Sequence, residues 1–574
     1  MRTAPVCYAM AGLVFSLLAA ASAAAAPAIS SFTPASGTIG NHVVINGSGF
    51  TGATAVKFNG VTAAYTVNSD IKITATVPNA ASTGLISVTA ASSTGASATS
   101  FGVTPGVALS IDAGHPYITP TVFGAGFHPS APVDLYFDSG NVALFVTSPT
   151  GTLSTVYQIP GSAQPGQHWI TFIERGSYWA AQKAFTVQTD WAQEGFGASG
   201  RGVNIYENTL DTGNVGTLTT AWSGNAGGAA NQAPFVVAGG SIFVGDVIGQ
   251  IYAYSKTGAL LWTAAGGDME SVNPAAASGR VFFGDSNGNV ASYSQTCRSD
   301  GGVCAPQWTI NIGNAVTAGL TYRNGTLYVP SADGSIHTLN PTTGAPGTSI
   351  YGYDTAHGAV TTPVVFDAAG GFFYGAGVTL EYSLAFGSTG FHNYGGSVSP
   401  LAVSNGTAYF TTSDGYLHRA PLGSAGWDAT TSIGGCVAAP VVAFGYVYAG
   451  GCSTLAAYNP KAGGKIWSIG TGNIEGISEA NGVIYVCENG ILQAYDANYG
   501  GYLWTGGWCT SAPEVSNGKV FATFALVFEY DLPSVVGASR PAPSVASLHP
   551  DYKLKPQLSG TAVVSKVAVN LSTE

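Results

Sequence analysis

Apolar and polar residues alternate with a period of two over most of the chain, in short runs separated by Gly, Ser, Asn and Pro. This alternation is typical of half-buried β-strands, because successive side chains of a strand point to opposite faces of the sheet. The stretch from residue 29 to 60, ISSFTPASGTIGNHVVINGSGFTGATAVKFNG, shows the pattern, and a similar stretch runs from 106 to 188. The pattern predicts an all-β protein.

From about Asp190 the pattern becomes a repeat. Three segments each hold an apolar strand with a Tyr near its end, a glycine turn and a second strand that ends in Trp: GQIYAYSKTGALLW (249–262), TLAAYNPKAGGKIW (454–467) and GILQAYDANYGGYLW (490–504). Between the copies, Asn-Gly pairs such as Asn324–Gly325 and Asn481–Gly482 predict tight hairpins, because the turn that suits twisted strands needs positive φ at both positions.

The spacing of the repeat indicates the architecture. Trp222, Trp262 and Trp308 are 40 and 46 residues apart, and Trp427, Trp467 and Trp504 are 40 and 37 apart. Ile350 and Phe391 stand near the equivalent place in two further copies. A period near 40 with four short strands is typical of propeller blades. Because the first copy has only an outer strand, around 218–222, and three strands follow Trp504, we expect that strand to complete the last blade. The prediction is an eight-bladed β-propeller, with seven blades as the alternative.

Resemblances to two known kinds of domain indicate the domain organisation. The first stretch resembles an IPT/TIG immunoglobulin-like domain, and the match lies in Ile29, Pro34, Gly37, Gly47, Gly49, Phe50, Val56, Phe58, Gly60 and Pro78. Residues 105–189 resemble a second Ig-like sandwich more loosely, through a second G-x-G-F at Gly124–Phe127. We therefore expect a signal peptide (1–23), an IPT/TIG domain (27–104), a second Ig-like domain (105–189), a propeller (190–533) and a flexible tail (534–574).

The repeat itself resembles the PQQ-like repeat. In that family the Trp and Gly of the motif dock adjacent blades, which implies a structural role for the tryptophans Trp222, Trp262, Trp308, Trp467 and Trp504. The family includes quinoprotein dehydrogenases, but their adjacent Cys–Cys pair and a C-x-x-C-H haem attachment are missing here, and no calcium-ligand set can be assigned. We expect no cofactor; a PQQ-type quinone and calcium belong only to the alternative function.

Composition narrows the function classes. Charged residues make up 8% of the chain, and 18 Lys and Arg against 29 Asp and Glu give a net charge of −11, which argues against nucleic acid as a partner. Signatures of P-loops, G-x-S-x-G hydrolases and H-E-x-x-H zinc enzymes are missing from the sequence.

The N-terminus predicts export. Arg2 precedes an apolar run over 9–21 and small residues over 22–26, as in a signal peptide, for which we expect cleavage after Ala23. An uncleaved anchor is the alternative. No later segment holds the ~20 consecutive apolar residues of a membrane-spanning helix. A secreted, periplasmic or cell-surface protein is expected, with no transmembrane segment in the mature chain.

Six cysteines follow Cys7, and an even number in an exported chain predicts disulfides. Six cysteines allow 15 connectivities, but their positions favour the sequential pairs Cys297–Cys304, Cys436–Cys452 and Cys487–Cys509. We expect the first pair only to tie an insertion loop, and Cys509 to begin the inner strand of the blade after the one that holds Cys487. No C-x-x-C pair or Cys/His cluster supports a metal site.

Polar residues concentrate in the loops that join an outer strand to the next inner strand, which converge on one end of a propeller channel. These candidates are Asn225, Asp268, Glu270, Asn314, Asp354, His357, His392, Asn473, Glu475 and Trp508. Acids, His and an aromatic side chain would suit a sugar, a cation or a peptide. The plainer interpretation is that polar residues collect in loops.

The leading hypothesis is therefore an exported, non-catalytic binding or scaffold protein, in which two Ig-like modules present a propeller to a protein or glycan ligand. The alternative is a quinone-dependent oxidoreductase of the cell envelope. A third possibility, a lipoprotein-type scaffold for envelope assembly, is weakened because Cys7 precedes the apolar run and cannot be a lipidated cysteine.

Overall fold

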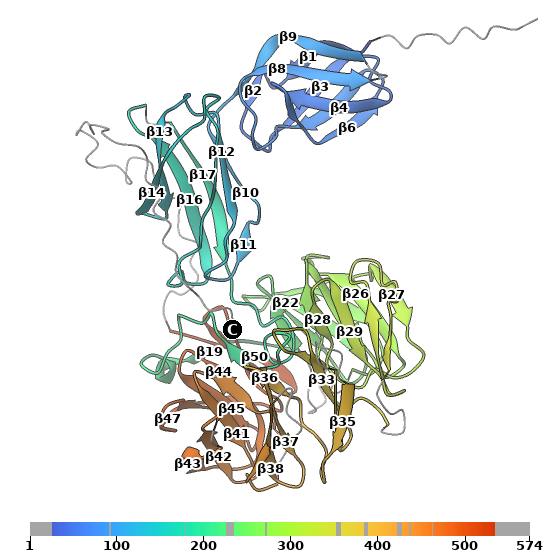
Figure 1. Ribbon diagram of the computed structural model, residues 1–574, viewed down its shortest axis with the longest axis vertical. Coiled ribbons are helices and arrows are strands. Elements are labelled where there is room, and N and C mark those ends of the chain that lie inside the picture. The colour runs from blue at the N-terminus through green and yellow to red at the C-terminus, as the bar shows by residue number, and fades with distance from the viewer. Residues whose placement is uncertain are drawn as a thin grey trace, which may run out of the picture.

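The computed structural model describes residues 26–90, 93–177, 179–225, 235–269, 272–351, 358–383, 389–421, 428–435, 438–461 and 463–533. Figure 1 shows three bodies along the long axis: a first sandwich (blue), a second sandwich (teal) and a ring of sheets (green to red). The expected signal peptide and tail, and the residues Glu270, Asp354, His357, Trp427 and Cys436, lie outside the described residues.

The first sandwich packs a four-stranded sheet on a five-stranded sheet. One sheet has the order β1 (Ala28–Thr33), β3 (His42–Ser48), β7 (Lys72–Thr76) and β6 (Tyr65–Ser69). The other has the order β2 (Ser36–Gly37), β9 (Ser93–Val103), β8 (Gly84–Ala90), β4 (Ala53–Phe58) and β5 (Val61–Thr62). The period-two apolar residues, among them Val43, Ile45, Val56 and Phe58, meet in one core between the sheets.

The second sandwich repeats this plan. One sheet contains β10 (Gly106–Leu109), β12 (Thr121–Ala125) and β15 (Leu153–Val156). The other contains β11 (Ala113–Gly114), β17 (Ala180–Val187), β16 (Gly166–Glu174), β13 (Pro132–Phe137) and β14 (Gly140–Val146). In both sandwiches a two-residue strand, β2 or β11, changes sheet and pairs in parallel with the last strand, β9 or β17.

The ring consists of sheets of four antiparallel strands, which follow chain order from the centre outward with one exception: β19 (Thr219–Asn225) is the outer strand of the last sheet. In one sheet a further two-residue strand, β18 (Val203–Asn204), pairs in parallel with the inner strand. The inner strands are β20 (Phe235–Ala238), β24 (Ala275–Ala277), β28 (Thr321–Arg323), β32 (Val365–Phe366), β36 (Ala402–Ser404), β40 (Val441–Ala443), β44 (Ile474–Ala480) and β48 (Glu514–Ser516). The second strands are β21 (Ser241–Gly245), β25 (Arg280–Gly284), β29 (Thr326–Pro330), β33 (Phe372–Ala376), β37 (Thr407–Thr412), β41 (Tyr446–Gly450), β45 (Val483–Glu488) and β49 (Lys519–Thr523).

The third strands are β22 (Gln250–Ser255), β26 (Asn289–Ser294), β30 (Ser335–Leu339), β34 (Thr379–Ser383), β38 (Tyr416–Pro421), β42 (Thr454–Tyr458), β46 (Ile491–Asp496) and β50 (Leu526–Asp531). The outer strands are β23 (Leu260–Ala265), β27 (Trp308–Asn311), β31 (Ile350–Tyr351), β35 (Thr389–Asn393), β39 (Asp428–Ser432), β43 (Lys465–Gly470), β47 (Tyr502–Trp508) and β19 (Thr219–Asn225). Within the described residues the ring thus has eight sheets of this kind.

The ring closes through its N-terminal strand. β19 pairs antiparallel with β50, and the last sheet has the order β19-β50-β49-β48. The inner strands of that sheet and of the first sheet, β48 and β20, are also in contact. The chain is therefore all-β, with two sandwiches ahead of a propeller, and its N-terminal outer strand completes the C-terminal blade as the repeat spacing predicts.

Tryptophans of the repeat join neighbouring blades. The indole Nε1 donates to a backbone oxygen of the following blade in four cases: Trp262 to Gln295 (3.4 Å), Trp308 to Pro341 (3.1 Å), Trp467 to Ala497 (3.1 Å) and Trp504 to Leu218 (3.0 Å). A glycine of the following blade lies against the ring, since a Cβ at Gly258, Gly344 or Gly500 would come within 2.7–2.8 Å of Trp222, Trp308 or Trp467. The Gly and the Trp of the motif are thus two halves of one contact.

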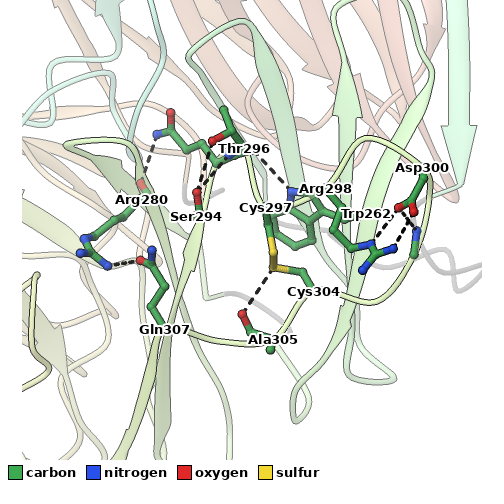
Figure 2. The surroundings of a disulfide bond; sticks show 12 residues. Trp262, Arg280, Ser294, Thr296, Cys297, Arg298, Asp300, Cys304, Ala305 and Gln307 are labelled. Carbon is green, nitrogen blue, oxygen red and sulfur yellow. Dashed lines mark hydrogen bonds and ion pairs between the residues drawn. A yellow bond between two sulfur atoms is a disulfide. The ribbon is translucent and has the colours of Figure 1, made fainter. Parts of the chain in front are cut away.

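The Cys297–Cys304 disulfide is present, but the expectation that it only ties a loop is wrong (Figure 2). Its loop lies along the outer strand β23 of the preceding blade, where Thr263 donates to Gly302 (3.1 Å) and accepts from Cys304 (2.7 Å). Val303 and Thr263 form a parallel bridge, and Cys304 packs in the core around Trp262. The insertion therefore covers the exposed edge of that blade.

The Cys487–Cys509 disulfide is also present, with a Cα–Cα distance of 5.7 Å. Cys509 directly follows β47 of the same blade, and β48 begins only at Glu514, so the expected strand register for Cys509 is wrong. The bridge fastens β45 to the point where the chain leaves β47. Cys452 is disulfide-bonded as well, while Cys436, its expected partner, lies outside the described residues.

Candidate functional site

Residues 189–204, TDWAQEGFGASGRGVN, form a belt inside the ring. The belt bonds to every inner strand in turn. The contacts are Thr189 with Ser516 of β48, Trp191 with Val237 of β20, Ala192 with Ala276 of β24, Gln193 with Tyr322 of β28, Ala198 with Phe366 of β32, Ser199 with Val403 of β36, Arg201 with Val442 of β40, Gly202 with Glu479 of β44 and Asn204 with Val515 of β48. Asn204 also donates to the Thr189 carbonyl (3.2 Å), so the belt's end meets its beginning.

Glycine lets the belt lie this close to the blades. Gly200 has φ +63°, and a Cβ there would lie 2.2 Å from the Leu401 carbonyl oxygen. Gly202 has φ +66°, and a Cβ there would lie 2.8 Å from a Val441 methyl carbon. Other residues rarely adopt positive φ and would collide at these positions.

The belt is the floor of a central cavity of about 320 Å³, within the range of small-ligand sites. Belt residues such as Trp191 and Glu194 line it from one side, and residues at or just before the inner strands form its walls. The walls include four prolines, which precede β32, β36, β40 and β48: Pro363, Pro400, Pro440 and Pro513. The belt bonds to residues that lie further along the inner strands than the residues of the cavity wall. It therefore closes one end of the channel. The cavity opens at the end where outer strands lead to the next inner strand.

Two carboxyl groups lie inside the cavity. Glu194 of the belt accepts a hydrogen bond from Asn273 Nδ2 (2.8 Å), and a Cβ at Gly319 would lie 2.4 Å from its Oε2, so glycine makes room for it. Glu514 begins β48, is 6% exposed, and its Oε2 has no hydrogen-bond partner. Burial raises the pKa of Glu514 well above its usual range, with a further contribution from the charge of Glu194. Burial raises the pKa of Glu194 as well.

One residue expected at the channel mouth lines the cavity. Glu475 lies at the rim, where its carboxylate accepts from Gly490 N (3.0 Å) and from Asn473 Nδ2 (3.3 Å). Six other expected residues lie outside the lining: Asn225, Asp268, Asn314, His392, Asn473 and Trp508. Trp508 is exposed and lies 5.8 Å from the Phe524 ring, and His392 lies 4.7 Å from Tyr394.

The belt, Glu194 and Glu514 were not predicted from the sequence. A signal for Glu514 was present, because the residue after the inner-strand proline is apolar in other copies: Val364, Leu401 and Val441. Among these four copies, only the one at Pro513 has an acidic residue after the proline. For the belt, the signal was the density of glycines between 195 and 202.

Two stretches of the chain match models of known families. Residues 27–103 match the model of the IPT/TIG domain, and residues 211–301 match a repeat model described as outer membrane protein assembly factor BamB. The chain carries a PQQ-like propeller behind an IPT/TIG domain. No curated protein matches the chain in sequence.

Solved structures share the fold of the PQQ-like propeller. The quinohemoprotein alcohol dehydrogenase from Comamonas testosteroni matches with a TM-score of 0.51 at 12% identity, over 61% of this chain and 81% of that one. A quinohemoprotein alcohol dehydrogenase from Pseudomonas putida gives 0.50 at 12%, over 62% and 82%. BamB from Moraxella catarrhalis gives 0.44 at 14%, over 55% and 99%. At these identities the likeness concerns the fold alone.

Two further properties of the described residues concern metal binding and membranes. No three His, Cys, Asp or Glu side chains in that part of the chain come together as metal ligands. No helix in the same residues is long and apolar enough to cross a membrane.

Proposed function

We propose that the protein is an exported, non-catalytic binding protein whose propeller presents the open end of the central cavity to a protein or glycan ligand. The observation that carries this proposal is the belt, which closes one end of the channel and leaves one face for access. The second sandwich joins the propeller at the belt end. There Asn208 donates to Gly161 and Ala163 (both 2.9 Å), and His115 stacks on Tyr206 (3.9 Å). The open mouth therefore faces away from the Ig-like modules.

The cavity wall favours binding over catalysis. The hydroxyls of Thr317, Thr361 and Thr510 donate to backbone carbonyls, so none of them is paired with a base as an activated nucleophile would be. Among the described lining residues, Glu is the only ionisable type. A polycarboxylated quinone would meet carboxyl groups there and no Arg or Lys, so the lining does not fit the cofactor of the alternative function.

Two further features support the proposal. Disulfides persist outside the reducing cytosol, which supports export. The match to the model of an outer membrane protein assembly factor supports a protein as ligand.

A blocked-mouth variant tests the proposal. Purified full-length protein would be screened against cell-surface glycans and envelope proteins, together with Ala439→Trp, which fills the cavity wall, and Thr257→Trp on an exposed turn. We expect a ligand that the unmodified protein and Thr257→Trp bind and Ala439→Trp does not. Absence of any ligand, or binding that Ala439→Trp leaves unchanged, would contradict the proposal. So would a bound chromophore with dye-linked alcohol oxidation after quinone and Ca²⁺ are added.

A further inference from the structure

Glu514 occupies a position that an apolar residue holds in other copies of the repeat. Its Oε2 is buried without a hydrogen-bond partner and lines the central cavity. An unpaired carboxylate in such a place is costly, because water no longer solvates its charge. The buried group is therefore stable only when it is protonated or when a positively charged ligand pairs with it.

Glu194 brings a second carboxyl group to the same cavity from a segment more than 300 residues away in the sequence. Its charge acts on Glu514, and its own hydrogen bond comes from the neutral amide of Asn273. The lining described above contains no Lys, Arg or His to balance the two acids. Both groups thus offer acceptors to a ligand that enters from the open end.

The rest of the cavity indicates the shape of that ligand. Pro363, Pro400, Pro440 and Pro513 line the cavity near the starts of β32, β36, β40 and β48, together with small residues such as Gly476. The threonine hydroxyls of the wall donate to backbone carbonyls, and the prolines beside the buried carboxyl groups suit an alkyl chain that carries a positive charge at its end. An ammonium group has three donors and no acceptor, which complements two carboxylates.

We propose that the central cavity binds the ammonium group of a linear alkylamine, with Glu194 and Glu514 as acceptors and the four prolines beside the alkyl chain. This inference rests on the proposed function, because it specifies the chemistry of the same cavity. A calcium site is the less suitable interpretation. Calcium takes six to eight oxygen ligands, and no group of three acidic or His ligands occurs among the described residues.

The test is calorimetric titration of the full-length protein with putrescine and cadaverine, and separately with CaCl₂. Glu514→Gln and Glu194→Gln keep the size of the side chain and remove the charge, and Asp268→Asn removes an exposed charge outside the cavity. We expect amine binding that each Gln variant weakens about tenfold or more and that Asp268→Asn leaves unchanged. Thermal melts verify that each variant is folded. If one Gln variant does not fold, the other still tests the proposal.

The outcomes separate the two proposals. If amines do not bind while a protein or glycan ligand binds in a manner that Ala439→Trp abolishes, the proposed function stands and the ammonium site is wrong. If neither binds, both are wrong. Calcium binding that Glu514→Gln abolishes, or amine binding that neither Gln variant weakens, would also overturn the inference.

Discussion

Several glycines lie where another segment of the chain packs so closely that a side chain would collide with it. In the repeat, Gly258, Gly344 and Gly500 lie under the tryptophan of the preceding blade. In the belt, Gly200 lies against the carbonyl of Leu401, at a positive φ. Gly240 shares the positive φ, at +75°, but a Cβ there would meet nothing within 4 Å. Comparison of a substitution at Gly200 with one at Gly240 therefore separates the cost of a side chain at positive φ from the cost of a collision with the neighbouring segment.

We predict that Gly200→Ala destabilises the protein more than Gly240→Ala. Both variants place a Cβ at positive φ, which costs about 1–2 kcal/mol, but only Gly200→Ala also pushes the belt off its neighbour. We expect a loss of roughly 3 kcal/mol or more for Gly200→Ala, measured by denaturant unfolding. Hydrogen exchange adds a local readout, because the amides of Phe366, Val403 and Val442 donate to the belt and should exchange faster in this variant alone. Equal effects of the two substitutions would contradict the belt's role.

Buried acids are the second feature at the residue scale. Glu479 on β44 is fully buried, and its Oε1 accepts from Gly482 N (2.7 Å). Burial raises the pKa of Glu479 from 4.5 to about 8. The same cause raises the pKa of Glu207, which is also buried. The folded protein therefore holds protons that the unfolded chain releases.

This predicts that stability falls as the pH rises. Because the folded-state pKa of Glu479 lies above its ordinary value, its contribution is complete below pH 4.5 and is lost as the pH approaches about 8. The loss is expected to reach a few kcal/mol, since each pKa unit corresponds to about 1.4 kcal/mol. Glu479→Gln should flatten this dependence and stabilise the protein at about pH 8.5, as thermal melts across the pH range would show. Asp268→Asn is the exposed control, and a Glu479→Gln profile that parallels the unmodified protein would refute the prediction.

At the scale of elements, local sequence patterns predicted the hairpins correctly. They did not predict contacts between segments that are far apart in the sequence. Asn324, Asn405, Asn481 and Asn517 have φ between +48° and +56°, as the hairpin signal requires. The expected outer-strand positions Ile350 and Phe391 lie in β31 and β35. Such features depend on neighbours in the sequence, so periodicity and turn residues suffice to find them.

The belt could not be found in this way, because its partners are spread over the whole propeller. Residues 189–204 bond to strands from β20 to β48 and have no regular pattern of their own. Cys509 was misplaced for a related reason: a strand start was read from the repeat, whereas β47 continues to Trp508. Glu194 and Glu514 line one cavity only because the belt runs inside the ring of inner strands, which no local pattern encodes.

The two described disulfides should contribute unequally to stability. Cys487–Cys509 closes 22 residues and Cys297–Cys304 closes 7. In the chain-entropy model the longer loop gives about 1 kcal/mol more stabilisation. We predict a larger fall in melting temperature for Cys487→Ala/Cys509→Ala than for Cys297→Ala/Cys304→Ala. The second pair of substitutions should instead raise hydrogen exchange at Thr263, which donates to the insertion loop. A larger fall for the shorter loop would show that the covering of β23 outweighs loop entropy.

At the scale of the whole molecule, the ring is closed twice. β19 closes the blades at their outer side by pairing with β50, and the belt closes on itself at the centre through Asn204 and Thr189. Both closures come from the stretch that follows the second sandwich. The propeller is thus tied to the Ig-like modules by the same segment that forms the floor of its cavity.

Trp504 and Trp467 offer a matched test of the outer closure. Trp504 donates to Leu218, which precedes β19 and is 286 residues away, whereas Trp467 makes the equivalent bond to Ala497, 30 residues away. Replacement of either by Phe removes one hydrogen bond worth about 0.5–1.5 kcal/mol, so similar losses in the free energy of unfolding are expected.

Only Trp504→Phe loosens the ends of the ring, because the lost contact spans the junction between the first and last strands. We predict faster unfolding for Trp504→Phe in denaturant-jump kinetics and faster hydrogen exchange throughout β19 and β50. Trp467→Phe should affect only its own blade and the following one. If both variants unfold at the same rate and leave β19 equally protected, closure through Leu218 does not limit the opening of the propeller.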